Sequence, residues 1–403
     1  LIVSLARQSH IESHRLSHYA TMALLVFATL LVVAGFLSVF SEVRLSKLFT
    51  GYGHEFSARN RPQFPFATIG GLTLYRPIGF MNTRLSYAGL LNFGLLILAG
   101  RTLGALPRSL SRVLGGADGV DGSESALDST SRWKRREWLV WSALIVIGLI
   151  ILWMNGSRSG LLACGLSLGI LFAFALYRGV KNRKAAHAIG YAPGASATTR
   201  GMASTHGYHG WIGLLLFLLL LGGATLLYLQ MLRTGTYRST DFMRPIIWKG
   251  ALEIFQDHIW IGVGPGNYPD AFEAWRHALS LQYPRTMYFL QITPDSHAHN
   301  DILHWLAIAG IPGGALFLAL IFACIRLLGQ LFSKYAGRKQ LTPSHWMELS
   351  LLAAITGFFL AGLSQCYFQD DEVVVVFWVF LAMATILGRA GNEQESGPAE
   401  ASK

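Results

Sequence analysis

The fold of this chain is indicated most directly by a long apolar stretch that follows a short polar cluster. Residues 302–325 read ILHWLAIAGIPGGALFLALIFACI, and residues 295–301 immediately before them read DSHAHND. An apolar run of this length is sufficient for one helix to cross a bilayer. The polar cluster would then lie at a membrane face, where ionisable side chains are costly and by default mark a functional site.

The composition of the whole chain indicates the same environment. Hydrophobic residues make up 52% and charged residues 14% of the sequence, whereas charged residues form about a quarter of a typical soluble domain. Long apolar runs predict helices, since lipid-exposed segments must satisfy their own backbone hydrogen bonds. The predicted spans are residues 19–40, 86–104, 137–154, 159–177, 209–231, 302–327, 347–369 and 373–389. We therefore predict an all-α polytopic membrane protein with about eight transmembrane helices and one large external loop that contains short amphipathic helices.

The distribution of Lys and Arg among the loops predicts the orientation. Segments 105–136, 178–208 and 328–346 are basic, which is typical of cytoplasmic loops. Alternation of the spans then places the long loop 232–301 outside. The predicted organisation is five N-terminal spans in residues 1–231 with flexible cytoplasmic loops at 105–136 and 178–208, the large external loop 232–301, three spans in residues 302–390, and a cytoplasmic tail at 391–403.

Net charge and cysteine usage narrow the range of partners. The net charge of +11 is spread over loops on both faces, without the basic stripe on a soluble domain that nucleic-acid binding requires. Anionic lipid surfaces account for it better, so we expect a bilayer and no nucleic acid. Cys164, Cys324 and Cys366 fall within predicted spans and are interpreted as small apolar residues. We expect neither a metal nor a cofactor.

The long external loop contains two predicted amphipathic helices. The first opens at Arg244-Pro245 and runs to about Asp257, and the second begins at Pro269. Their apolar faces would lie along the membrane interface and roof a cavity.

The polar cluster is predicted to form part of an anion site. Asp295 or Ser296 can cap a helix that begins before His299, which would leave backbone N–H groups near the histidine, where phosphate groups bind well. Arg244, and Arg158 in a short outer turn, carry guanidinium groups that match a diphosphate. Three separated segments would then converge on one anion.

Short motifs give the sequence a family resemblance. They are His299-Asn300 followed after nine residues by Gly310-Ile311-Pro312-Gly313, the Ser-Arg-Ser-Gly turn at 157–160, the run from Arg244 to Asn267, and Gly79-Phe80-Met81-Asn82 before a span. The first resembles the His-Asn-x9-Gly-x-x-Gly pattern of the O-antigen ligase and polymerase superfamily, in which it follows a large periplasmic loop. The similarity extends from about residue 76 to residue 390. Family members have more spans before that loop than this chain shows, so we expect further N-terminal spans.

The resemblance implies a membrane glycosyltransferase of the O-antigen ligase type in the bacterial inner membrane. It would move a glycan from undecaprenyl diphosphate to an acceptor hydroxyl at the periplasmic face, without a metal. The acceptor would be a glycolipid, a glycan or a protein. In this hypothesis His299 is the catalytic base, and the substrate-binding residues are Arg158, Arg244, Asn300, Arg76 and Arg84.

Several other interpretations remain open on the sequence. An O-antigen or exopolysaccharide polymerase, or a protein O-oligosaccharyltransferase, would use the same groups. A lipid-linked sugar transporter would use a cationic cavity without breaking bonds. His297 and His299 with two aspartates are conceivable zinc ligands, but the HExxH spacing is absent. A carboxylate of segment 370–372 is an alternative partner for His299, and the arginines are alternatively headgroup anchors.

Overall fold

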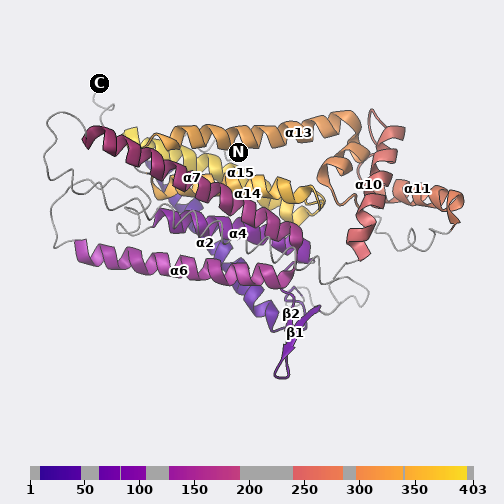
Figure 1. Cartoon of the computed structure of the whole chain (residues 1–403), viewed down its shortest axis with the longest axis horizontal. Coiled ribbons are helices and arrows are strands. Elements are labelled where there is room, and N and C mark those ends of the chain that lie inside the picture. The colour runs from indigo at the N-terminus through magenta and orange to yellow at the C-terminus, as the bar shows by residue number, and fades with distance from the viewer. Residues whose placement is uncertain are drawn as a thin grey trace.

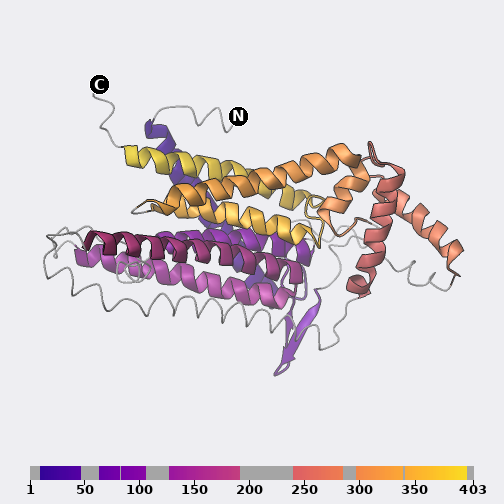
Figure 2. The same cartoon turned by 45° about the horizontal axis from the view of Figure 1, so that its top comes forward.

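The computed structural model describes residues 10–46, 63–81, 83–105, 127–190, 239–284, 296–338 and 341–396. Within them the protein is mostly helical, as predicted. Six described helices are long and apolar enough to cross a membrane: α2 (His10–Val39), α4 (Arg84–Gly104), α6 (Leu127–Asn155), α7 (Arg158–Gly190), α13 (Asp301–Ala336) and α14 (Pro343–Gly362). Most of them lie side by side along one direction, and α2 crosses them obliquely (Figures 1 and 2).

These six helices correspond to six of the eight predicted spans. Predicted span 209–231 lies outside the described residues. Predicted span 373–389 lies within helix α15 (Asp371–Ser396), which is not among the six. The predicted number of eight spans is therefore not confirmed.

Two helices extend further toward the basic loops than the hydropathy pattern predicts. Helix α6 begins at Leu127, inside the predicted connector 105–136, and α7 continues to Gly190, inside connector 178–208. Lys, Arg and Ala are good helix formers, and polar side chains at the end of a bundle helix can remain in water. A hydropathy search marks the apolar part of a helix and not its ends.

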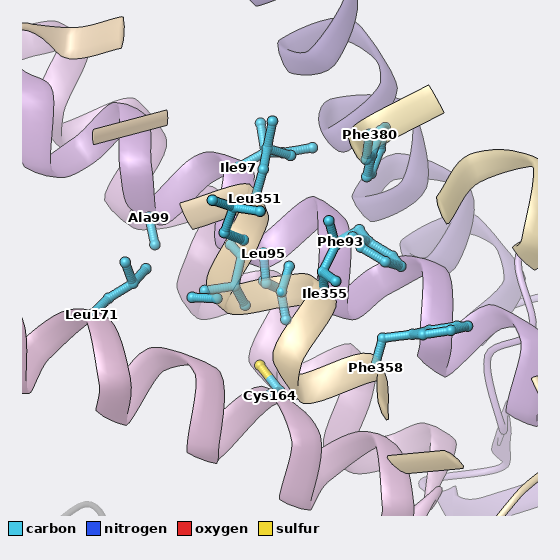
Figure 3. Close-up of a cluster of buried hydrophobic side chains, with 14 of the residues drawn as sticks. Phe93, Leu95, Ile97, Ala99, Cys164, Leu171, Leu351, Ile355, Phe358 and Phe380 are labelled. Atoms are coloured by element: carbon cyan, nitrogen blue, oxygen red, sulfur yellow. The ribbon is translucent and has the colours of Figure 1, made fainter. Parts of the chain in front are cut away.

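Helices α4 and α14 form the centre of the bundle. Their apolar windows are 78% and 89% buried, compared with 22% for α6, whose apolar side chains are largely exposed. Figure 3 shows Phe93, Leu95 and Ile97 of α4 together with Leu351, Ile355 and Phe358 of α14. Apolar burial drives helix association weakly in lipid, so close packing of this kind has to hold the bundle together.

Small residues allow this close packing. A Cβ atom added to Gly100 of α4 would lie 2.3 Å from the Ser350 hydroxyl oxygen of α14. A Cβ atom added to Gly357 of α14 would lie 2.8 Å from the Ala163 carbonyl oxygen of α7. Glycine at these points brings helix backbones into near contact, as is common between transmembrane helices.

One segment departs from the predicted all-α fold. Strands β1 (Pro65–Ile69) and β2 (Leu72–Tyr75) form an antiparallel hairpin in which Thr68 pairs with Thr73. Gly70 and Gly71 connect the strands with φ of 57° and 84°, a conformation that favours glycine at both positions. Gly-Gly between two short β-prone runs is a hairpin signal, but a search for long apolar runs does not detect it.

Helices α10 (Ser239–Asp257) and α11 (Tyr268–Gln282) lie within segment 232–301, which the sequence predicts to be a long external loop with short helices. Helix α10 starts before the predicted Arg244-Pro245, so Pro245 lies inside it and removes one helical hydrogen bond. The two helices pack face to face, since a Cβ atom on Gly250 would lie 2.5 Å from the Phe272 ring. Figure 1 shows the pair beyond one end of the bundle.

Helix α13 is interrupted at Gly310, where φ is 61° and ψ is −158°. The turn that follows α10 bonds the backbone groups around the break: Val263 N–H donates to the Ala307 carbonyl (2.9 Å), Gly264 N–H to that of Ile308 (2.9 Å), and Ile311 N–H to that of Ile259 (2.8 Å). The loop helices are thereby fastened to the membrane-spanning helix that carries the histidine motif.

Candidate active site

His299 occupies a constrained position immediately before α13. Its φ is 48°, the only positive value among the described non-glycine residues. Asn300 is the N-cap of α13, because its side-chain oxygen accepts a hydrogen bond from Leu303 N–H at 3.1 Å. The helix thus begins after His299, and the predicted cap at Asp295 or Ser296 was wrong for the described residue Ser296, while Asp295 lies outside the described residues.

A loop between α14 and α15, which we call the 363–370 loop, holds this segment from the other side. The Asn300 amide donates to the Leu363 carbonyl at 3.0 Å. The Asp301 carboxylate accepts from the backbone N–H groups of Tyr367 and Phe368, both at 3.3 Å. Both polar groups of Asn300 are engaged within the protein and support the histidine segment, while its contact with substrate stays a prediction.

The 363–370 loop also corrects the predicted span 347–369, because α14 ends at Gly362. Residues 363–370 read LSQCYFQD, a mixture of polar and apolar residues, so hydropathy does not mark the end of the helix clearly. Their backbone remains satisfied because Asp301 binds it, which replaces the bonds that a continued helix would make. Cys366 consequently lies in this loop and not in a span, and its thiol is buried.

Gln365 is the hydrogen-bond partner of His299. Its amide oxygen lies 3.1 Å from Nδ1 of His299, and its side chain is only 4% exposed. Nε2 of His299 is buried and has no hydrogen-bond partner among the described residues. Of the carboxylates considered as alternative partners, Asp370 is engaged elsewhere, since it accepts from the Ser86 hydroxyl at 2.9 Å.

Arg244 of α10 lies close enough to His299 to act on it electrostatically. Burial lowers the pKa of His299 below its ordinary value, and the positive charge of Arg244 lowers it further, while the hydrogen bond to Gln365 acts in the opposite direction. Burial also lowers the pKa of the neighbouring His297 to about 3, with contributions from His299 and His304. Both imidazoles are therefore neutral near pH 7.

The other three predicted arginines lie on segments that meet at Asn155. Its amide donates to the carbonyl of Pro77, next to Arg76, at 2.7 Å and to the carbonyl of Arg84 at 3.1 Å. Its side-chain oxygen accepts from Ser157 N–H at 3.1 Å, in the turn that leads to Arg158. One buried amide thus brings the backbones of three separated segments together.

Arg158, Arg84 and Arg76 differ in the parts of the protein that hold them. Arg158 is the first residue of α7, whose N-terminus is capped by the Ser157 hydroxyl accepting from Gly160 N–H at 3.2 Å. The Arg84 guanidinium lies 5.2 Å from the centre of the Phe64 ring, and Arg76 N–H donates to the Phe64 carbonyl at 2.8 Å. Arg84 and Arg76 are therefore tied to the hairpin segment.

The 363–370 loop connects the arginine segments to the histidine. Tyr367 is buried next to the hydroxyls of Ser157 and Ser159, while its backbone N–H binds Asp301. The N-terminus of α7 and the start of α13 therefore contact the same loop. His299, Arg244, Arg158, Arg76 and Arg84 all lie at the end of the bundle where α10, α11 and the hairpin are found (Figure 1).

Sequence reasoning missed Gln365, the hydrogen-bond partner of His299. It also missed His304, one turn into α13, which contacts Gln369 and lies edge-on to the Tyr268 ring with ring centres 4.8 Å apart. The only available signal was two glutamines four residues apart at the end of an apolar run. The described residues contain no group of three His, Cys, Asp or Glu side chains placed to hold a metal, and Asp295, one of the zinc ligands considered, lies outside them.

Comparison with known families identifies this region. A family model described as O-antigen ligase matches residues 143–318. Residues 143–318 are an O-antigen ligase family domain. The matched segment contains Arg158, Arg244 and His299, so the resemblance seen in the sequence motifs is confirmed. No curated protein matches the chain. The family and the apolar helices together support a multi-pass membrane enzyme of the O-antigen ligase or polymerase type.

Proposed function

We propose that the chain is a metal-independent glycosyltransferase that moves a glycan from undecaprenyl diphosphate to an acceptor hydroxyl at the periplasmic face of the bacterial inner membrane. The observation that carries this proposal is the environment of His299. Its Nδ1 is occupied by Gln365, its buried Nε2 has no partner among the described residues, and the Arg244 charge lies nearby. A neutral imidazole with one nitrogen that makes no hydrogen bond to the described residues is suited to accept a proton.

In the proposed reaction, Nε2 of His299 takes the proton from the acceptor hydroxyl as its oxygen attacks the anomeric carbon. The new bond from oxygen to carbon forms while the bond from carbon to the phosphate oxygen breaks, and its electron pair leaves with the diphosphate. One direct displacement inverts the anomeric centre. The protonated imidazole then passes its proton to solvent or to the leaving group.

The arginines offset the charges that this step creates. A positive imidazolium next to Arg244 is unfavourable by itself, which is why the arginine lowers the pKa of His299. The departing diphosphate brings negative charge to the same place at the same moment. Arg244 and Arg158 would therefore stabilise the transition state more than the resting enzyme, which is the condition for catalysis.

The orientation of the chain supports a periplasmic site. Seven ends of the described helices lie on the side of the proposed site (Figure 1). They are the C-terminal ends of α2, α6 and α14 and the N-terminal ends of α4, α7, α13 and α15. The basic loops of the sequence connect the opposite ends, and such loops stay in the cytoplasm.

The decisive experiment is reconstitution in vesicles with a lipid-linked glycan and an acceptor. The His299→Ala variant should lose about 10²–10⁴-fold in transfer rate, the usual contribution of a general base. His277→Ala, at an exposed position of α11, is the matched control and should retain the native rate. Native transfer by His299→Ala would show that His299 is not the base. Passage of the carrier across the bilayer with no glycan transfer by the native protein would establish a transporter instead.

The acceptor is proposed to be a lipid-linked core glycan, in line with the ligase description of the matching family. A polymerase would join repeat units, and a protein O-oligosaccharyltransferase would modify a hydroxyl side chain. Mass analysis of the glycan-bearing molecules in cells with and without the gene distinguishes these acceptors.

A further inference from the structure

Gln365 faces the histidine from a rigid part of the protein. The 363–370 loop is bound to the α13 segment at its start through Leu363 and Asn300 and at its middle through Asp301. Gln365 lies between these two attachments and is buried. Its side chain therefore has little freedom to turn away from Nδ1 of His299.

The chemistry of the amide decides which nitrogen of His299 carries the proton. An amide oxygen can only accept, so the imidazole nitrogen 3.1 Å from it has to donate. With the proton on Nδ1, the lone pair is on Nε2, the nitrogen without a partner among the described residues. The backbone N–H of His299 donates to Nδ1 of His297 at 3.3 Å. This bond holds the backbone of His299, from which its imidazole extends toward Gln365.

The charge of the partner matters as well as its position. A carboxylate in place of Gln365 would stabilise the protonated imidazole and raise its pKa, whereas a neutral amide orients the ring with a much smaller effect. The other groups that act on His299 are the guanidinium of Arg244 and the imidazole of His297, whose ring centre is 4.1 Å away. The nearby carboxylates of Asp301 and Asp370 bind the backbone of the loop and Ser86 instead.

We propose that Gln365 is the positioning residue of the reaction proposed above, which holds His299 in the tautomer with Nδ1 protonated and Nε2 open while leaving the imidazole uncharged. The inference rests on the proposed function for its catalytic meaning. The hydrogen bond and its effect on His299 can be tested separately from turnover.

The first test measures protonation of His299 without any reaction. Diethyl pyrocarbonate modifies neutral imidazole, so mass spectrometry of the peptide containing His299 after brief treatment at a series of pH values gives its titration. In Gln365→Glu the midpoint should move upward by about one unit or more, because an opposite charge then lies beside the ring. Gln282→Glu adds the same charge at an exposed position of α11 and should leave the midpoint unchanged. An unchanged midpoint in Gln365→Glu refutes the inference.

The second test measures transfer. Gln365→Met keeps a side chain of similar length but offers no oxygen, and should lower kcat by about 10–100-fold, the usual loss when the partner that orients a functional histidine is removed. KM for the lipid-linked donor should not change, because a positioning residue acts through His299 and not on the donor. An unchanged kcat in a folded Gln365→Met variant also refutes the inference.

The two tests separate the inference from the proposed function. If the midpoint of His299 moves in Gln365→Glu but the native pH–rate profile does not follow the titration of His299, the positioning contact is established and His299 is not the base. If Gln365→Glu moves the midpoint of His299 and the pH–rate profile by the same amount, the positioning role of Gln365 and the role of His299 as base are both supported.

Discussion

Gly310→Ala tests whether the break in α13 holds the loop helices in place. A Cβ atom at residue 310 would lie 2.5 Å from the Ile259 carbonyl oxygen and 2.6 Å from the Trp260 carbonyl carbon. These are backbone atoms, so they cannot move aside as a side chain can. The local φ of 61° with ψ of −158° is moreover a region open almost only to glycine, with a cost of about 1–3 kcal/mol for other residues.

The close approach of the turn after α10 to Gly310 also allows backbone hydrogen bonds between that turn and α13, so a side chain at residue 310 would cost those bonds as well. Three backbone bonds join the turn after α10 to α13 on both sides of Gly310, and each contributes about 0.5–1.5 kcal/mol net. Strain and lost bonds together give a destabilisation of about 2.5–7.5 kcal/mol. Because Arg244 is on α10, separation of the turn from α13 would also move it away from His299.

The assay is unfolding of purified protein in detergent, followed together with the transfer rate. Gly329→Ala in the same helix is the matched control, because a Cβ atom there meets nothing within 4 Å and alanine in a helix is about 0.5–1 kcal/mol better than glycine. Gly310→Ala should unfold at a clearly lower temperature and lose transfer activity, while Gly329→Ala should gain slightly in stability. If Gly310→Ala is as stable and as active as Gly329→Ala, the proposed coupling between the break and the loop helices is wrong.

Three further changes follow from the site. Because burial and then Arg244 lower the pKa of His299 and only the neutral form can accept a proton, the pH–rate profile should stay level through about pH 6.5, the ordinary value, and fall only at lower pH; a fall that starts above this value would contradict the assignment. Asn155→Ala removes the amide that donates to the carbonyls of Pro77 and Arg84, so it should cost about 1–3 kcal/mol of stability and raise KM for the lipid-linked glycan. The comparison is Asn92→Ala, which removes an amide whose hydrogen bond is longer, at 3.4 Å. Equal stability of the two variants would argue against a special role for Asn155. Arg244→Ala should lower kcat by about 10²–10³-fold, and Arg244→Lys should recover only part of it because lysine cannot bind a diphosphate with a planar fork; full recovery by lysine would show that charge alone is sufficient.

Much of the architecture could be predicted because hydropathy is a local property. Twenty apolar residues in succession commit a segment to the bilayer whatever the rest of the chain does. The same reasoning placed the ionisable residues at the ends of spans. It failed for the hairpin at 65–75 and for the end of α14, because a short strand or a short loop of mixed polarity is not resolved by a search for long apolar runs.

The site could be predicted only in part. The residue types and the order of His299, Arg244 and Arg158 along the chain indicate anion and proton chemistry, and the family match covers all three. Their distances, the open Nε2 and the shared amide of Asn155 depend on segments that are far apart in sequence. No pattern within a window of twenty residues contains that information.

The sequence by itself determined that this chain is built of membrane-spanning helices with a polar cluster at one end, because each of those properties belongs to a contiguous run of residues. The tertiary structure alone decided which nitrogen of His299 lacks a partner among the described residues, because Gln365, which binds the other nitrogen, is 66 positions away and lies in a loop that the sequence predicts to be part of a helix. Burial of that loop is possible because Asp301 satisfies its backbone, and such a pairing exists only once α13 and α14 have packed together.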